Sequence, residues 1–364
     1  MSTSEAPATV AAETKDDDVP NERAYWRKPL ARYTQPRVWR SLLDLALAVP
    51  PYLALSALMV VTFGHVSYFV TLAIAIPTGG FLLRTYILFH DCTHGSLMPT
   101  KRANVMLGIP LGLMVLAPFS RWRHDHAVHH ATAGDLDRRG VGDIITLTVD
   151  EYEALDRKGR VAYRIKRNPV VMFGIGPIVA MMIGPRIWTK AQRPRMRHSV
   201  MLTDVALAVI VLALGFSLGW ERFVLVWMPP AMLAGSAGIW LFYVQHQFED
   251  AYWENTGGWS YADAALRGSS YLKLPKILQF FTGNIGLHHV HHLSARIPNY
   301  NLQRAHDENP IFHDVPVLTM RDGIRSMRLK LWDGRTGRLV TFRQARESMA
   351  VPPAGALAPA GVDA

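Results

Sequence analysis

The sequence contains a single cysteine, Cys92, which excludes an internal disulfide and a cysteine-rich zinc site. It also lacks the charged and then apolar layout of a cleaved signal peptide, because its first residues are polar and acidic. We predict disordered tails over residues 1–22 and over the Ala/Pro/Gly-rich residues 346–364. No aromatic stacking platform or nucleic-acid-binding signature accompanies the basic residues, so we expect no nucleic-acid partner.

Long apolar runs are abundant, and 49% of the residues are hydrophobic. A membrane span needs about 20 mostly apolar residues to cross roughly 30 Å of hydrocarbon. Four segments meet this requirement: 41–63, 66–89, 200–219 and 223–244. Only a few residues separate the members of each pair, so the sequence predicts an all-α integral membrane protein whose four transmembrane helices form two tight hairpins. We expect one membrane-embedded domain over residues 23–345, with a helical cap formed by 90–199 and 245–345.

The formal net charge of +10 is concentrated beside the apolar runs. By the positive-inside rule, the flanks that carry Arg37, Arg40, Lys101, Arg102 and Arg193 lie in the cytoplasm. We therefore expect a multi-pass membrane protein with cytoplasmic termini and a cytoplasmic cap. Two shorter apolar stretches, 104–118 and 169–185, are predicted to be interfacial or re-entrant, because spanning segments there would move a basic region to the outside.

Histidine is the residue that points to chemistry. Three clusters occur, HDCTH, HAVHH and HHVHH, and in each the first and last histidines are three or four positions apart. On a helix these positions share one face, with Cβ atoms roughly 5–6 Å apart. Neutral imidazole is a ligand for iron, zinc, copper and nickel. Eight such ligands are too many for one ion, so we predict a site for two metals built from His90, His94, His126, His129, His130, His288, His291 and His292.

Other polar residues near these clusters have two open roles. His246 lies just beyond the fourth apolar run, where it is either a further ligand or a residue that supports one. Four residues are candidates for contacts that support the ligands without binding metal: His124, Glu249, Asn284 and His289.

The ligand set favours iron. A zinc pair for hydrolysis usually comes with an acid–base carboxylate, whereas imidazoles at the membrane face suit an oxygen-activating iron pair that oxidises an apolar C–H bond. A metal transporter is disfavoured, because transporters place liganding groups at mid-membrane depth and the apolar runs here carry few ionisable residues.

Over roughly residues 80–335 the chain resembles the integral-membrane fatty acid desaturases, and among them the bacterial acyl-lipid omega-6 (Δ12-type) branch. The resemblance rests on FHDCTHGS, HHATAGDLDRRGVGDIITLTVDEY, VQHQFEDAYWENTG and GSSYLKLPKILQFFTGNIGLHHVHHLSARIPNYNL. The three histidine clusters alone are shared with sphingolipid, alkane and carotenoid oxygenases. Thr93 stands where the family pattern has glycine, which adds bulk beside a ligand.

The resemblance implies a di-iron enzyme that uses O2 to insert a cis double bond into the acyl chain of a membrane lipid. It makes the eight cluster histidines the ligands of two iron ions, with His246 as an additional ligand. The sequence has no HPGG-type haem motif, so the resemblance implies a separate electron donor such as ferredoxin. A hydroxylase of a sterol, carotenoid, alkane or sphingoid chain remains the alternative on the same scaffold.

Overall fold

The structure is a computed structural model that describes residues 24–190 and 192–350. Four of its helices are long and apolar enough to cross a membrane: α2 (Val38–Thr62), α3 (Tyr68–His94), α8 (Pro194–Leu218) and α9 (Trp220–His246). The four spans predicted from hydropathy are thus found, with ends that differ by a few residues. The predicted N-terminal tail lies outside the described residues. The last helix, α15 (Phe342–Ala350), continues into the predicted C-terminal tail, and the rest of that tail lies outside the described residues.

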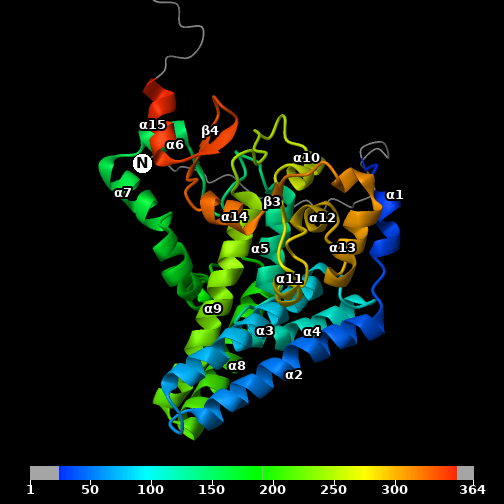
Figure 1. Ribbon diagram of the computed structural model, residues 1–364, viewed down its shortest axis with the longest axis vertical. Helices are drawn as coiled ribbons and strands as arrows, with labels where there is room; N and C mark the ends of the chain where they lie inside the picture. Colours follow the sequence, from blue (N-terminus) through cyan, green and yellow to red (C-terminus); the bar gives the residue numbers. More distant parts are fainter. Residues whose placement is uncertain (1–23, 191, 351–364) are drawn as a thin grey trace, which may run out of the picture.

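The long helices form two hairpins whose turns lie at the same corner of the molecule (Figure 1). Gly64 and Gly219 occupy these turns with φ values of 83° and 84°, a region that favours glycine. Helix α3 packs against both α2 and α9. At the second contact a Cβ atom on Gly79 would lie 3.0 Å from Leu233 Cβ, so the absence of a side chain lets the two helices approach.

The outer faces of the hairpins are apolar. The side chains of Phe69, Leu202 and Phe216 are large, and each residue is more than 70% exposed. So many large exposed apolar side chains are unusual for a protein surrounded by water. Apolar side chains are expected where helices contact lipid. The backbone polar groups of such helices need no water, because they are hydrogen-bonded within each helix.

Each of the two shorter apolar stretches adjoins a bend between two helical segments. Helix α4 (Lys101–Met114) meets α5 (Phe119–Thr132) at a bend of 98°. Helix α7 (Arg157–Lys166) meets the segment Val171–Arg186 at a bend of 59°. That segment contains the short helices η3 (Val171–Ile175), η4 (Ile178–Ile183) and η5 (Gly184–Arg186).

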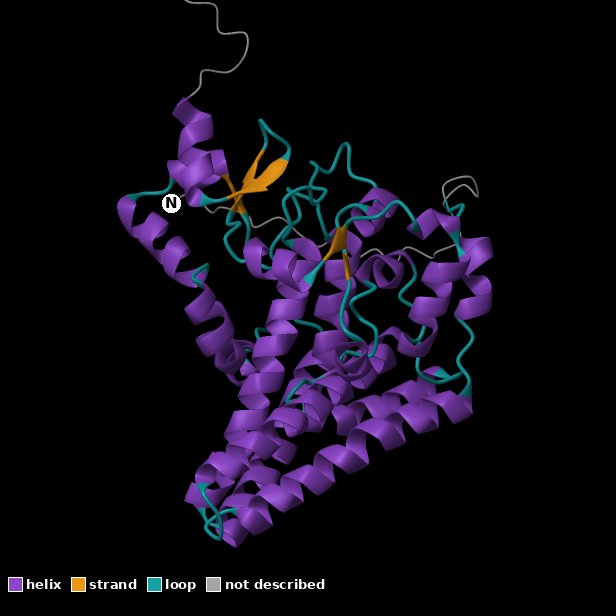
Figure 2. Cartoon of the chain, viewed as in Figure 1, coloured by secondary structure: helices purple, strands orange, loops and turns teal. Residues whose placement is uncertain are grey.

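The remaining elements form the cap, which is mostly helical with a few short strands (Figure 2). Strands β1 (Leu147–Thr148), β4 (Leu331–Asp333) and β5 (Arg338–Val340) form one small sheet, in which β1 is parallel to β4 and β4 is antiparallel to β5. Strands β2 (Tyr271–Leu272) and β3 (Val317–Leu318) pair in parallel. The other helices are α1 (Arg27–Leu30), η2 (Ala31–Tyr33), α6 (Val149–Ala154), α10 (Tyr261–Leu266), α11 (Lys276–Phe281), α12 (His288–Leu293), α13 (Asn299–Glu308), η6 (Pro310–Phe312) and α14 (Met320–Ser326).

Candidate metal centre

The nine histidines singled out as ligands lie together in two groups, although they come from four helices far apart in the sequence. Within each group, one ring nitrogen of every histidine lies within 4.8 Å of those of the others. The five-histidine cluster consists of His90, His94, His126, His130 and His291, and the four-histidine cluster consists of His129, His246, His288 and His292.

Two of the histidine helices contribute to both clusters. Helix α5 gives His126 and His130, four residues apart, to the five-histidine cluster, and His129 to the other. Helix α12 gives His288 and His292 to the four-histidine cluster and His291 to the other. The pattern HxxHH thus sends an i, i+4 pair to one cluster and the residue between them to the neighbouring cluster, which places the clusters side by side.

Two membrane helices bring the remaining histidines to the two clusters. His90 and His94 occupy the last turns of α3, which Gly95 terminates in the left-handed conformation with φ of 71°. His246 is the last residue of α9. Both helices therefore continue past their apolar runs and end at the metal centre.

In the five-histidine cluster, single ring nitrogens lie close to two other ring nitrogens, and hydrogen bonds alone cannot account for all of these contacts. His126 Nε2 lies 2.9 Å from His90 Nε2 and 3.1 Å from His130 Nε2. His130 Nε2 also lies 3.0 Å from His291 Nε2. Each neutral ring nitrogen has either one proton or one in-plane lone pair, so it can complete only one of these contacts. A cation at the centre of the cluster would satisfy all of them, and the residues therefore fit a bound metal.

The four-histidine cluster gives the same result. His246 Nε2 lies 3.0 Å from His288 Nε2, and the Nε2 atoms of His129 and His292 are buried without a hydrogen-bond partner. A buried polar nitrogen without a partner is costly. Coordination of a metal would remove that cost.

Acceptors outside the cluster fix which nitrogen of two ligands points inward. Nδ1 of His246 donates to the Gly268 carbonyl oxygen at 3.1 Å, and Nδ1 of His129 donates to the Asp143 carboxylate. In both rings the proton is therefore on Nδ1, and the Nε2 lone pair points into the cluster. Sequence reasoning missed Gly268 and Asp143. Asp143 lies within the quoted string HHATAGDLDRRGVGDIITLTVDEY, but spacing does not reveal that its loop returns to the helix.

The imidazoles of α12 are held neutral. Burial lowers the pKa of His288, His291 and His292 well below its ordinary value, and the neighbouring histidines lower it further. Neutral imidazole is the form that binds a metal, so at neutral pH these rings need no deprotonation before coordination.

A buried polar network connects the five-histidine cluster to the first hairpin. Asp91, whose Oδ1 lies 3.6 Å from His90 Nδ1, accepts hydrogen bonds from the Asn299 backbone at 2.9 Å and side chain at 3.0 Å. The Asn299 amide also donates to Asp44 at 3.2 Å, and Asp44 pairs with Arg84 at 2.8 Å. This network connects α2, α3 and α13 behind the ligands. Asp91 and Asn299 were not among the predicted site residues, although Asp91 lies inside HDCTH.

Comparison with known proteins agrees with this geometry. The family described as fatty acid desaturase matches residues 66–318, which include all nine histidines. This chain belongs to the fatty acid desaturase family. It is therefore an oxidoreductase of lipid acyl chains whose reaction depends on O2.

Individual desaturases resemble this chain to different degrees. A fatty acid desaturase of Bacillus subtilis is 43% identical over 327 residues, which cover 90% of this chain and 93% of the relative. The sn-1 oleoyl-lipid 12-desaturase of Synechocystis is 27% identical over 241 residues, covering 63% of this chain and 65% of the relative. The chloroplastic omega-6 fatty acid desaturase of Arabidopsis thaliana is 27% identical over 252 residues, which cover 63% of this chain and 51% of the relative.

The four residues singled out as supports of the ligands occupy different positions in this desaturase. His124 is partly exposed and lies 3.3 Å from Asp125, and Glu249 is exposed and faces Arg338 at 3.6 Å. Asn284 adopts φ of 58° and lies 3.5 Å from the Asn299 carbonyl oxygen. The fourth, His289, is buried on the other side of α12.

His289 Nε2 lies 3.0 Å from His306 Nδ1, a contact outside both clusters. Thr93 is also buried, and its hydroxyl donates to the His90 carbonyl oxygen at 2.7 Å. Neither residue adds a nitrogen to either metal cluster.

Proposed function

We propose that this desaturase binds two iron ions, one in each histidine cluster, and inserts a cis double bond into the acyl chain of a membrane lipid. The observation that carries the proposal is the partition of nine histidines into two adjacent clusters of facing ring nitrogens. An all-imidazole set suits a redox-active iron pair. In the assignment we favour, all nine histidines, His246 included, are ligands.

The chain's own residues prepare this site. When bound, the iron pair would activate O2, which is reduced to two waters by two hydrogens from adjacent methylenes together with two protons and two electrons from an external donor. Gly268 and Asp143 hold His246 and His129 in the tautomer that presents Nε2. The burial of most of the surrounding rings keeps bulk water away from the clusters.

For the position of the double bond we propose omega-6, that is, conversion of an oleoyl to a linoleoyl group. The support comes from the relatives whose names specify this position, the sn-1 oleoyl-lipid 12-desaturases and the chloroplastic omega-6 desaturases, which are 24–27% identical. The reaction consumes two electrons that neither the lipid nor O2 provides. We propose ferredoxin, or a similar one-electron protein, as their donor.

The product of the expressed chain tests this function. In an aerated host that makes oleoyl lipids and contains a ferredoxin system, we expect a dienoic acyl chain by gas chromatography and mass spectrometry. The matched control is His129→Ala, which should give none. A hydroxylated chain carrying oxygen from O2 would contradict the reaction, and a double bond elsewhere would contradict the omega-6 position.

We further propose that the metal centre faces the cytoplasm across the bacterial inner membrane. The basic residues beside the ends of α2, α3 and α8 that lie near the histidines support this orientation. In a variant with Cys92 replaced, a cysteine at position 140 should react only with a cytoplasmic reagent, and one at position 64 only with an external reagent. The reverse pattern would overturn the orientation.

A further inference from the structure

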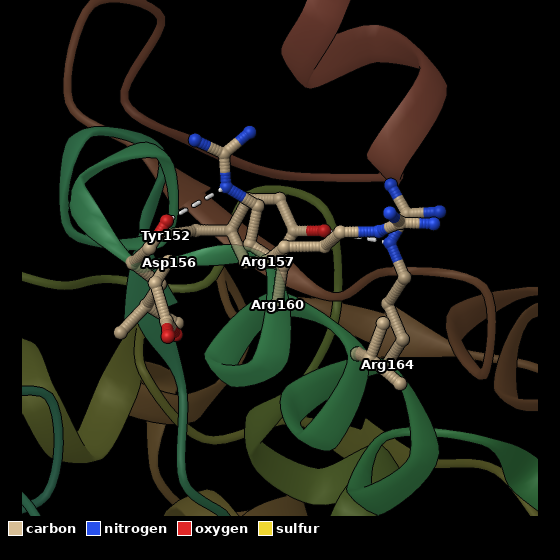
Figure 3. Close-up of a pocket in the computed structure, with 7 residues that line it drawn as sticks. Tyr152, Asp156, Arg157, Arg160 and Arg164 are labelled. Carbon is tan, nitrogen blue, oxygen red and sulfur yellow. Dashed lines mark hydrogen bonds between the residues drawn. The ribbon is translucent and has the colours of Figure 1, made fainter.

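A basic pocket of about 440 Å³ lies between α6 and α7, at the edge of the cap (Figures 1 and 3). The Tyr152 ring forms part of its wall, and the guanidinium groups of Arg160 and Arg164 lie 5.9 and 5.8 Å from the centre of that ring. The pocket is lined by Tyr152, Leu155, Asp156, Arg157, Arg160, Val161 and Arg164. None of these residues belongs to the metal centre.

The three arginines of the pocket have different partners. Arg160 is neutralised, because it pairs with Glu153 at 2.9 Å and donates to the Leu155 carbonyl oxygen at 3.0 Å. Arg164 donates through Nε to the Tyr152 hydroxyl at 2.6 Å and lies 4.8 Å from the Phe342 ring centre. This leaves its two terminal nitrogens without a carboxylate partner in the described part of the chain.

Arg157 likewise has no ion pair with a carboxylate among the residues that the structure describes. The one acidic residue of the pocket, Asp156, accepts a hydrogen bond from the Gly159 backbone at 2.7 Å and so caps the start of α7. The pocket therefore has an excess of positive charge, and Arg164 is held in place by an aromatic wall. A planar guanidinium group held in this way suits a phosphate group.

The position of α7 places this pocket at the surface of a membrane. Val161 and Ile165 are 49% and 54% exposed, and they alternate with the basic residues of the helix. After the 59° bend, the chain continues into an apolar segment that packs against α9 through η3 and exposes Ile175 and Val179. A basic helix with exposed apolar residues, joined directly to a lipid-facing segment, is typical of a helix at the headgroup level.

We propose that the pocket lined by Arg157, Arg160 and Arg164 binds the phosphate of an acidic phospholipid in the leaflet that surrounds the cap. Arg157 and Arg164 contact the phosphate oxygens, Arg160 shapes the wall, and Leu155 and Val161 contact the apolar part of the lipid near its headgroup. The site is separate from the iron clusters, so it does not depend on the proposed reaction.

Native mass spectrometry of the full chain in detergent tests the proposal. The chain is titrated with dioleoylphosphatidylglycerol and, separately, with dioleoylphosphatidylcholine. We expect one bound phosphatidylglycerol that phosphatidylcholine does not replace. The double variant Arg157→Gln/Arg164→Gln should weaken this binding by roughly tenfold or more, because both phosphate contacts are lost.

The matched control is Lys158→Gln/Lys166→Gln, which removes the same charge from α7 but alters no residue of the pocket. This control should bind phosphatidylglycerol as the unmodified chain does. If the arginine double variant does not fold, Arg157→Gln alone provides the test, because that side chain forms no ion pair in the described residues.

Equal weakening in the arginine and lysine variants would show a diffuse charge effect and overturn the proposal. Displacement of phosphatidylglycerol by inorganic phosphate at the same concentration would assign the pocket to a free anion and also overturn it. Equal binding of the two lipids by the unmodified chain would remove the selectivity for an acidic headgroup.

Discussion

Asp143 accepts a hydrogen bond from Nδ1 of His129, and this contact directs the other ring nitrogen of His129 into the four-histidine cluster. The aspartate comes from the loop after α5, thirteen residues beyond the last histidine of that helix. A loop residue therefore determines how a helical ligand is presented. The orientation of His129 depends on tertiary structure and not only on the spacing within HAVHH.

Replacing this acceptor should weaken the site without removing a ligand. We expect Asp143→Asn to lower metal affinity or desaturation by about 10–100-fold, the usual effect of losing such a partner. Metal content and product yield, measured on the same membranes, check this. Asp125→Asn is the matched control. The Asp125 carboxylate pairs with Arg121 at 2.6 Å and belongs to neither cluster. Unchanged metal content and activity in Asp143→Asn would contradict the role assigned to Asp143.

Loss of a ligand should have a larger effect. We expect His90→Ala, His129→Ala and His292→Ala each to abolish desaturation while the protein still inserts into the membrane, because no neighbouring group replaces the lost nitrogen. His65→Ala and His313→Ala should retain activity, since neither residue belongs to a cluster. Product formation by the His129 or His292 variant at the level of the unmodified chain would refute the ligand assignment.

The buried pair of Asp44 and Arg84 makes a separate prediction about stability. Asp44→Leu leaves the Arg84 charge buried without its partner, which should destabilise the protein by roughly 3–5 kcal/mol. The double variant Asp44→Leu/Arg84→Leu should be more stable than Asp44→Leu alone, because it removes both charges. Thermal unfolding in detergent compares them. A double variant less stable than Asp44→Leu would show that the charge pair is not the source of the effect.

Lys330 makes the stability of the cap depend on pH. Burial and, to a lesser extent, the nearby positive charge of Arg167 together lower the pKa of this lysine from 10.5 to about 7. The unfolded chain therefore holds the proton over a pH range in which the folded chain has released it. Stability should rise between about pH 7 and 10, because over this range the unfolded state binds one more proton than the folded state, and the rise should end once the unfolded lysine also loses its proton.

Melting temperatures across this pH range, compared with Lys330→Met, check the sign. The variant should show a smaller rise with pH, whereas Lys273→Met, at an exposed lysine, should keep the original dependence. A rise of the same size in Lys330→Met would assign the pH dependence to other groups.

The sequence predicted the spans and the histidines that gather into the two clusters, because both depend on local patterns. About 20 consecutive apolar residues mark a span wherever they occur, and histidines three or four positions apart share a helix face. The partition of ligands was not predictable in this way. His129 and His130 are adjacent in sequence but lie in different clusters, and only the packing of α5 against α12 and α9 decides this.

Contacts made by loops were hidden for the same reason. Gly268 orients His246 through a backbone carbonyl, a group that every residue carries and that leaves no mark in the sequence. Glu249 shows the converse, because the sequence made it a candidate for a contact that supports a ligand. Helix α9 ends at His246, and beyond it the chain turns so that Glu249 faces Arg338.

The metal content of active protein tests the account most directly. Iron measured by elemental analysis on purified chain should approach two ions per chain, and desaturation should rise in proportion to bound iron when metal-depleted protein is reloaded. His288→Ala, which removes a ligand from the four-histidine cluster alone, should lower the iron bound per chain. Full desaturase activity with one iron or none per chain would contradict the two-cluster iron centre.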